Sequence, residues 1–140
     1  MFALIENIVK RNKEGIEVER NAIGIVKDQI YGMSWTHNQT PQCIVFDSPV
    51  FITYLNKEEV IMVLPISTPN EIFLYRECGE ILQRLTILDI VPNIRGEIVY
   101  PKIDKNGKLL GFLTRYNTDE FFIEFNIKTL AFGSVNRVRI

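Results

Sequence analysis

The sequence predicts one β-rich α+β domain over residues 1–140. Antiparallel strands, about nine or ten of them, are expected to form a curled sheet, barrel or sandwich, packed with a short N-terminal helix and one central helix. Three observations favour this class. Apolar and polar residues alternate along much of the chain, turn residues separate the apolar runs, and a helical period occurs in only two segments.

The first segment predicts a short helix. Phe2, Ile5 and Val9 fall on one helical face, and basic residues at positions 10, 11 and 13 suit the negative end of the helix dipole. Gly15 can then adopt the left-handed conformation that ends a helix. We therefore expect a helix before the first strand.

Alternation with a period of two begins after this segment. Its apolar members are Ile16, Val18, Ile23, Ile25, Tyr31, Met33 and Trp35. Such alternation is typical of strands with one solvated face. A polar loop over Thr36–Gln42 is expected to follow, with Cys43–Phe46 as the next strand.

Two apolar runs in the centre of the chain predict an antiparallel pair. Val50–Leu55 follows the turn residues Asp47-Ser48-Pro49, and Asn56–Glu59 separates it from Val60–Leu64. A short polar turn between two runs of strand length favours a hairpin.

The central helix is predicted from about Pro69 to Leu85. Thr68 is a capping residue, Pro69 stands at the first helical position and Glu71 at the third, which is a capping box with a proline start. Five residues then share one helical face: Leu74, Cys78, Ile81, Leu82 and Leu85. Gly79 weakens this helix by up to ~1 kcal/mol relative to alanine.

The last part of the chain predicts strands again. Glu97–Ile103 and Leu109–Tyr116 flank the pair Asn106-Gly107, which is a strong hairpin signal. Glu120–Phe125 is aromatic and β-branched, and Val135–Ile140 contains alternating apolar and basic residues. Most neighbouring strands are therefore joined by hairpins, which favours antiparallel pairing.

Composition and charge restrict the partners and the compartment. The formal net charge is -1, so the chain has no basic excess with which to bind a nucleic-acid backbone. No apolar run approaches the ~20 residues of a membrane-spanning helix, and Met1–Asn12 lacks the pattern of a signal peptide. Cys43 and Cys78 are expected to be free thiols in a reducing compartment. The location is therefore of the cytoplasmic type, or the virion if a phage encodes the chain.

Sequence motifs for catalysis and cofactor binding are missing. His37 is the only histidine, and the two cysteines lack the spacing of a zinc site. The segment that starts at Asp104 lacks the later glycine and glutamate of a calcium loop, and no phosphate-binding loop occurs. We therefore expect no metal, no cofactor and no catalytic residue. An enzyme or small-molecule binder with a site around His37, Trp35 and Cys43 is one alternative.

These observations favour a non-catalytic protein-protein interaction or assembly subunit of a larger complex. A tail, neck or capsid-associated component of a phage virion is one example, with another protein or further copies of this chain as the partner. A cytosolic inhibitor or immunity protein that binds one partner is a second alternative, because a small, mildly acidic single domain suits that role equally well.

Partner contacts are expected at aromatic and basic residues. Phe121 and Phe122 face opposite sides of one strand, so one of them lies outside the main core face. An uncovered aromatic side chain favours contact with a partner. The candidate contact residues are Trp35, His37, Phe121, Phe122, Arg137 and Arg139.

Overall fold

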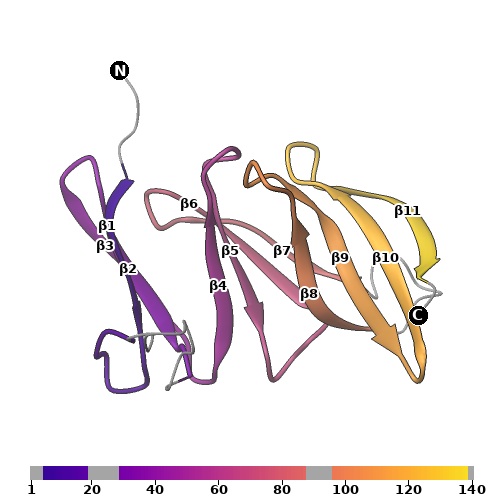
Figure 1. The fold of residues 1–140 in the computed structure, drawn as a ribbon. Coiled ribbons are helices and arrows are strands. Elements are labelled where there is room, and N and C mark those ends of the chain that lie inside the picture. Colours follow the sequence, from indigo (N-terminus) through magenta and orange to yellow (C-terminus); the bar gives the residue numbers. More distant parts are fainter. Residues whose placement is uncertain (1–4, 19–28, 88–95, 139–140) are drawn as a thin grey trace.

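In a computed structural model, which describes residues 5–18, 29–87 and 96–138, every regular element is a β-strand. The described strands form three sheets, and within each sheet strands that are consecutive in the chain pair antiparallel (Figure 1). The first sheet contains β1 (Ile5–Arg11), β2 (Gly32–His37) and β3 (Thr40–Val45). The second contains β4 (Val50–Leu55), β5 (Val60–Pro65), β6 (Glu71–Arg76) and β7 (Ile81–Thr86). The third contains β8 (Glu97–Ile103), β9 (Leu109–Tyr116), β10 (Asp119–Asn126) and β11 (Ala131–Val138). None of the described residues belongs to a helix that is long and apolar enough to cross a membrane.

The middle sheet separates two hydrophobic cores, as its position between the other two sheets in Figure 1 shows. All residues of β5 are buried, because alternate side chains enter opposite cores: Ile61 and Val63 on one face, Met62 and Leu64 on the other. The first core lies against β1–β3 and contains Met33, Trp35, Ile44, Val50, Ile52, Ile61 and Val63. The second core lies against β8–β11, and its largest side chains include Met62, Leu74, Ile87, Phe112, Ile123 and Phe125.

The predicted N-terminal helix is wrong: its described part is strand β1, which pairs with β2. A β-bulge interrupts the register between Glu6 and Val9, and Asn7 there has a φ of 54°. A bulge adds one residue and breaks the period of two, so the apolar residues of a bulged strand can match a helical period. Gly15, expected to end the helix, lies in the turn after β1 with a φ of 81°.

The predicted central helix is also wrong. Residues 71–86 form the β6–β7 hairpin. Ile72 and Leu74 enter the second core, whereas Phe73 and Tyr75 pack on the first, so both faces of β6 are covered. A helix would leave one of these two apolar sets exposed. Gly79, with a φ of 89°, lies in the hairpin turn.

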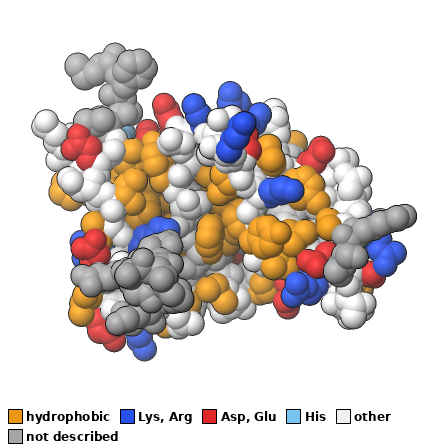
Figure 2. All heavy atoms as spheres, in the orientation of Figure 1, with side chains coloured by type: hydrophobic (Ala, Val, Ile, Leu, Met, Phe, Trp, Pro, Cys, Tyr) orange, Lys and Arg blue, Asp and Glu red, His pale blue; other side chains and the backbone are white. Residues whose placement is uncertain are grey.

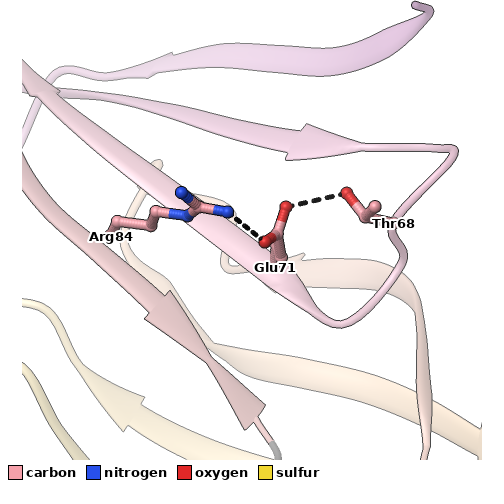
Figure 3. Close-up of polar contacts among 3 residues, drawn as sticks. All are labelled: Thr68, Glu71 and Arg84. Carbon is pink, nitrogen blue, oxygen red and sulfur yellow. Dashed lines mark hydrogen bonds and ion pairs between the residues drawn. The ribbon is translucent and has the colours of Figure 1, made fainter.

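The residues of the predicted capping box contact each other without starting a helix (Figure 3). Thr68 Oγ1 donates to Glu71 Oε2 at 2.9 Å, and the Glu71 backbone amide donates to the Thr68 carbonyl at 3.1 Å, which makes a turn before β6. Arg84 on β7 donates to Glu71 Oε1 at 2.5 Å. The hydrogen bond from Arg84, followed by that from Thr68, lowers the pKa of the Glu71 carboxyl. The Thr68–Glu71 pair of a capping box therefore predicts a local side-chain contact, and this contact also forms in a turn that leads into a strand.

The predicted central hairpin and the Asn106-Gly107 hairpin are confirmed. Val50–Leu55 pairs antiparallel with β5, and β8 pairs with β9 around a turn in which Gly107 has a φ of 83°. The polar loop over Thr36–Gln42 is mostly strand instead, because β2 and β3 meet in a two-residue turn.

The strands expected around residues 16–25 are largely untested. Ile16 lies in no strand, and an isolated bridge joins Arg11 to Glu17. Ile23 and Ile25 lie outside the described residues.

The turns of five hairpins lie toward the same end of the molecule, the upper side of Figure 1. They join β2 to β3, β4 to β5, β6 to β7, β8 to β9 and β10 to β11. The meander is the reason, because every second turn of a meander returns to the same end. We call this region the turn end.

Candidate functional site

A pocket of about 440 Å³ opens at the turn end, and we call it the histidine pocket. Four different hairpins supply its walls. The lining residues are His37, Glu58, Glu59, Val60, Arg76, Glu77, Cys78, Leu82, Ile127 and Lys128. The pocket therefore contains the only histidine of the chain, together with charged side chains of both signs.

Glu77 fixes the wall of the histidine pocket by two hydrogen bonds. Tyr54 Oη donates to Glu77 Oε2 at 2.6 Å, and Trp35 Nε1 donates to the Glu77 carbonyl at 2.7 Å. Glu77 is only 6% exposed, and burial, followed by the bond to Glu77, raises the pKa of the Tyr54 hydroxyl. The β6–β7 turn is thus tied to both β2 and β4.

Trp35 is not available as the partner contact expected from the sequence. Its side chain is 2% exposed and belongs to the first core. Its indole N–H donates a hydrogen bond to the Glu77 carbonyl in the β6–β7 turn. Trp35 therefore holds the pocket wall in place without lining the pocket. A period-two strand predicts which residues share a face, but it does not predict which face is covered.

The cysteine near His37 is Cys78, which lines the same pocket, and not Cys43, which is exposed on β3. A nucleophile and its base need to be within hydrogen-bond reach of each other. Among the described residues, no hydrogen bond joins His37 to Cys78 or to Glu77. In the same part of the chain, no group of three or more His, Cys, Asp or Glu side chains is placed to hold a metal ion.

A larger hollow of about 930 Å³ adjoins the histidine pocket and shares Glu58, Ile127 and Lys128 with it. It lies between the β8–β9 and β10–β11 hairpins and the β4–β5 turn. Four lysines line it, and we call it the lysine cleft: Lys57, Lys102, Lys108 and Lys128. Figure 2 shows basic side chains gathered at the upper edge of the molecule, over these turns.

The remaining candidate contacts are dispersed. Phe122 lines the lysine cleft, and Phe121 lies half-buried on the other face of β10. Arg137 is exposed at the sheet edge, where it donates to Asp119 at 2.6 Å. Arg139 lies outside the described residues. The structure therefore brings His37 and Phe122 to adjoining hollows and leaves Phe121 and Arg137 apart from them.

An apolar groove of about 570 Å³ lies away from the turn end, where β8 passes the lower halves of β4 and β5. Of the described residues that line it, only Ser67 and Glu97 are polar. Exposed hydrophobic side chains cover its surface: Phe51, Ile66, Val99 and Tyr100. Hydrophobic atoms gather over β4, β5 and β8 in Figure 2.

A backbone hydrogen bond and three prolines restrict the chain around the groove. The Ile98 amide donates to the Pro69 carbonyl at 2.6 Å, which ties β8 to the loop before β6. Pro65, Pro69 and Pro101 line the groove, and proline has a fixed φ and lacks an amide donor. Sequence reasoning missed this surface, because its residues come from three separate segments that share no motif.

Comparison with known proteins gives a fold. No protein-family model and no curated protein sequence matches the chain. A chain in the solved structure "Structure of Tne2 in complex with Tni2" has the same fold. It is 12% identical, the TM-score is 0.68, and the match covers 97% of this chain and 100% of that one. The solved structure is that of a complex of two proteins, Tne2 and Tni2.

Proposed function

We propose that this protein is a non-catalytic inhibitor or immunity-type protein that binds one partner protein through the apolar groove. The observation that carries the proposal is the exposure of large hydrophobic side chains around one groove, with Ile66 59% and Tyr100 51% exposed. Contiguous apolar surface of this kind is typical of a protein-binding site. The partner is therefore expected to present an apolar segment.

The composition of the groove suits an interface. Aromatic side chains such as Phe51 and Tyr100 are enriched in the energetically important centres of interfaces. Complete burial of a Val, Ile or Phe side chain stabilises by roughly 1.5–3 kcal/mol. The four exposed side chains of the groove are 39–59% exposed, so burying the part that remains exposed can supply about half of that value each, enough to offset part of the entropy lost on association.

The fold comparison and the cysteines support the proposal. The chain with the same fold comes from a complex of two proteins, as expected if this fold serves protein binding. Cys43 and Cys78 are both free and exposed, which favours a reducing compartment such as the cytoplasm. Neither observation favours a phage virion component or self-assembly, so the proposal is for one partner of a different sequence.

The test begins with tagged protein purified from its source organism. We expect the free protein to have the mass of a 16.3 kDa monomer, and the captured fraction to contain one other protein in equal amount. Adding the purified chain to that partner should inhibit the partner's activity. A homodimer that dissociates when Val99 and Tyr100 are both changed to Ser would favour the assembly hypothesis instead. Capture of no stoichiometric protein would contradict the proposal.

A matched pair of variants tests the surface. Val99→Ser with Tyr100→Ser removes two exposed apolar side chains of the groove, and we expect partner affinity to fall by about tenfold or more. Lys13→Glu, an exposed change outside the groove, should leave the affinity unchanged. Equal affinity for all three proteins would show that the partner binds elsewhere.

A further inference from the structure

The lysine cleft is a second surface with its own chemistry. The apolar groove shares none of its described lining residues, so a ligand of the cleft is independent of the partner proposed for the groove. The β4–β5 and β8–β9 turns meet beside the cleft: a Cβ atom at Gly107 would lie 3.0 Å from Asn56 Oδ1. A hollow of about 930 Å³ is large enough for several residues of another chain.

The floor of the cleft is apolar and partly aromatic. Leu109 and Phe125 are buried beneath it, and Phe132 is half-buried against Phe125. Phe122 is half-buried on the opposite face of β10, where it lies against Lys102. Gly111 makes room for the Phe122 ring, since a Cβ atom at Gly111 would lie 2.9 Å from Phe122 Cζ. The floor can therefore receive an apolar side chain between charged groups.

The rim of the cleft is basic and available. Lys102 Nζ lies 5.8 Å from the centroid of the Phe122 ring. Within residues 5–18, 29–87 and 96–138, no ion pair involves Lys102 or any of Lys57, Lys108 and Lys128. Four ammonium groups around one hollow, without carboxylate partners in the described chain, make an electrostatic complement to an acidic ligand.

Three acidic residues of the described chain also line the cleft, and one of them, Asp104, is engaged in its own structure. Asp104 Oδ1 accepts the backbone amides of Asn106 at 2.8 Å and Lys108 at 2.9 Å, which holds the β8–β9 turn. Glu58 Oε2 is buried and has no hydrogen-bond partner among the described residues. Glu124 is the remaining acid of the lining. These carboxylates limit the positive charge that a ligand meets, which disfavours a nucleic-acid backbone with its closely spaced phosphates.

We propose that the lysine cleft binds an acidic segment of a protein, whose carboxylates pair with the lysines while an apolar side chain between them lies on the Phe122 ring. Discrete carboxylates separated by an apolar side chain match both the spaced ammonium groups and the floor. The cleft then recognises its ligand by charge and by one hydrophobic contact.

A short peptide of Glu-Glu-Phe repeats is the probe, and its affinity is measured by fluorescence anisotropy. We expect it to bind the wild-type protein with an affinity that falls as salt is added. Lys102→Glu with Lys108→Glu should weaken binding by about tenfold or more. Lys13→Glu is the control for charge, and Val99→Ser with Tyr100→Ser is the control for the other surface; both should bind as the wild type does.

Three outcomes would overturn the proposal. The first is no binding of the acidic peptide, or equal binding of a Lys-Lys-Phe peptide. The second is unchanged affinity of the Lys102→Glu and Lys108→Glu protein when its thermal midpoint matches that of the wild type. The third is tighter binding of a single-stranded oligonucleotide or inorganic phosphate than of the peptide, which would assign the cleft to phosphate. Failure of partner capture alone leaves these results unaffected, so the two proposals fail separately.

Discussion

Glu77, in the β6–β7 turn, links this turn to β2 and β4 through two of its oxygen atoms. Its carbonyl accepts the Trp35 indole N–H, and its carboxylate accepts the Tyr54 hydroxyl. Hydrogen bonds to charged groups contribute about 1.5–3 kcal/mol, and removing one partner leaves the buried acceptor unsatisfied. At the scale of single residues, the wall of the histidine pocket therefore depends on Tyr54.

Tyr54→Phe is expected to lower the free energy of unfolding by about 1.5–3 kcal/mol at pH 7, because Glu77 loses its hydroxyl donor. The pKa of Tyr54 is raised in the folded protein, so its contribution is present below the ordinary tyrosine pKa of 10.0 and is lost as the pH rises above it. Wild-type stability should thus fall more steeply than that of the variant above about pH 10. Urea unfolding at several pH values measures both effects.

Tyr75 provides the control for this pH dependence. Burial raises the pKa of Tyr75, but Tyr75 is present in both proteins, so its effect cancels in the difference. Equal slopes of stability against pH for wild type and Tyr54→Phe would show that the hydroxyl of Tyr54 does not donate to Glu77.

At the scale of elements, the sequence patterns identify strands better than they distinguish helices from hairpins. Val50–Leu55, β5 and the Asn106-Gly107 hairpin follow from apolar runs bounded by turn residues, and the structure has them in place. Residues 71–86 also match a helical period, but the predicted face does not exist in the structure: Leu74 and Leu85 are buried in the second core, whereas Ile81 is exposed. The choice between a helix and a hairpin depends on the two cores, because both faces of β6 are covered only when the segment forms a strand between them.

Gly79→Ala distinguishes a helix from a hairpin, because the change in the free energy of unfolding has opposite signs in the two cases. In a helix the change to alanine would stabilise by about 1 kcal/mol. In the hairpin turn, where φ is 89°, an L side chain is strained, and the new Cβ atom would lie 2.8 Å from Gln42 Oε1. We therefore expect a loss of about 1–3 kcal/mol in the free energy of unfolding, measured by urea denaturation.

Gly15→Ala is the matched control for backbone strain. Gly15 has a φ of 81° and no atom within 4 Å of an added Cβ, so its substitution measures strain without a contact. The two variants should lose similar stability, with Gly79→Ala the larger loss if Gln42 cannot move. A gain of stability for Gly79→Ala would contradict the hairpin.

At the scale of the whole molecule, the layered arrangement could not be predicted from periodicity. The continuous apolar run of β5 indicated a strand, and its burial on both faces explains that run afterwards. Strand patterns fix which residues share a face and say little about which sheets stack.

The two candidate binding surfaces also could not be predicted from strand periodicity. The apolar groove joins Phe51, Ile66 and Tyr100 from separate strands and loops, and the lysine cleft joins three hairpins. Of the candidate contacts drawn from the sequence, His37 and Phe122 line hollows at the turn end, since aromatic and titratable residues could be found by type alone. Their neighbours, including Cys78, are set by packing between sheets and not by spacing along the chain.

The shared middle sheet predicts that both cores unfold together. Trp35, the only tryptophan, reports on the first core, whereas Phe112 is completely buried in the second, against Phe125. Because β5 contributes side chains to both cores, loss of one core exposes one face of the strand that also packs in the other core. Phe112→Leu should lower the free energy of unfolding by about 1–2 kcal/mol.

Trp35 fluorescence and far-UV circular dichroism, followed in the same urea titration, test this cooperativity. Phe112→Leu should shift both midpoints equally, although the substitution lies in the core that does not contain Trp35. Ile52→Val in the first core is the reciprocal control and should also shift both probes together. A fluorescence midpoint that stays at the wild-type value while the dichroism becomes biphasic would mean that the third sheet unfolds separately, and that the middle sheet does not couple the two cores.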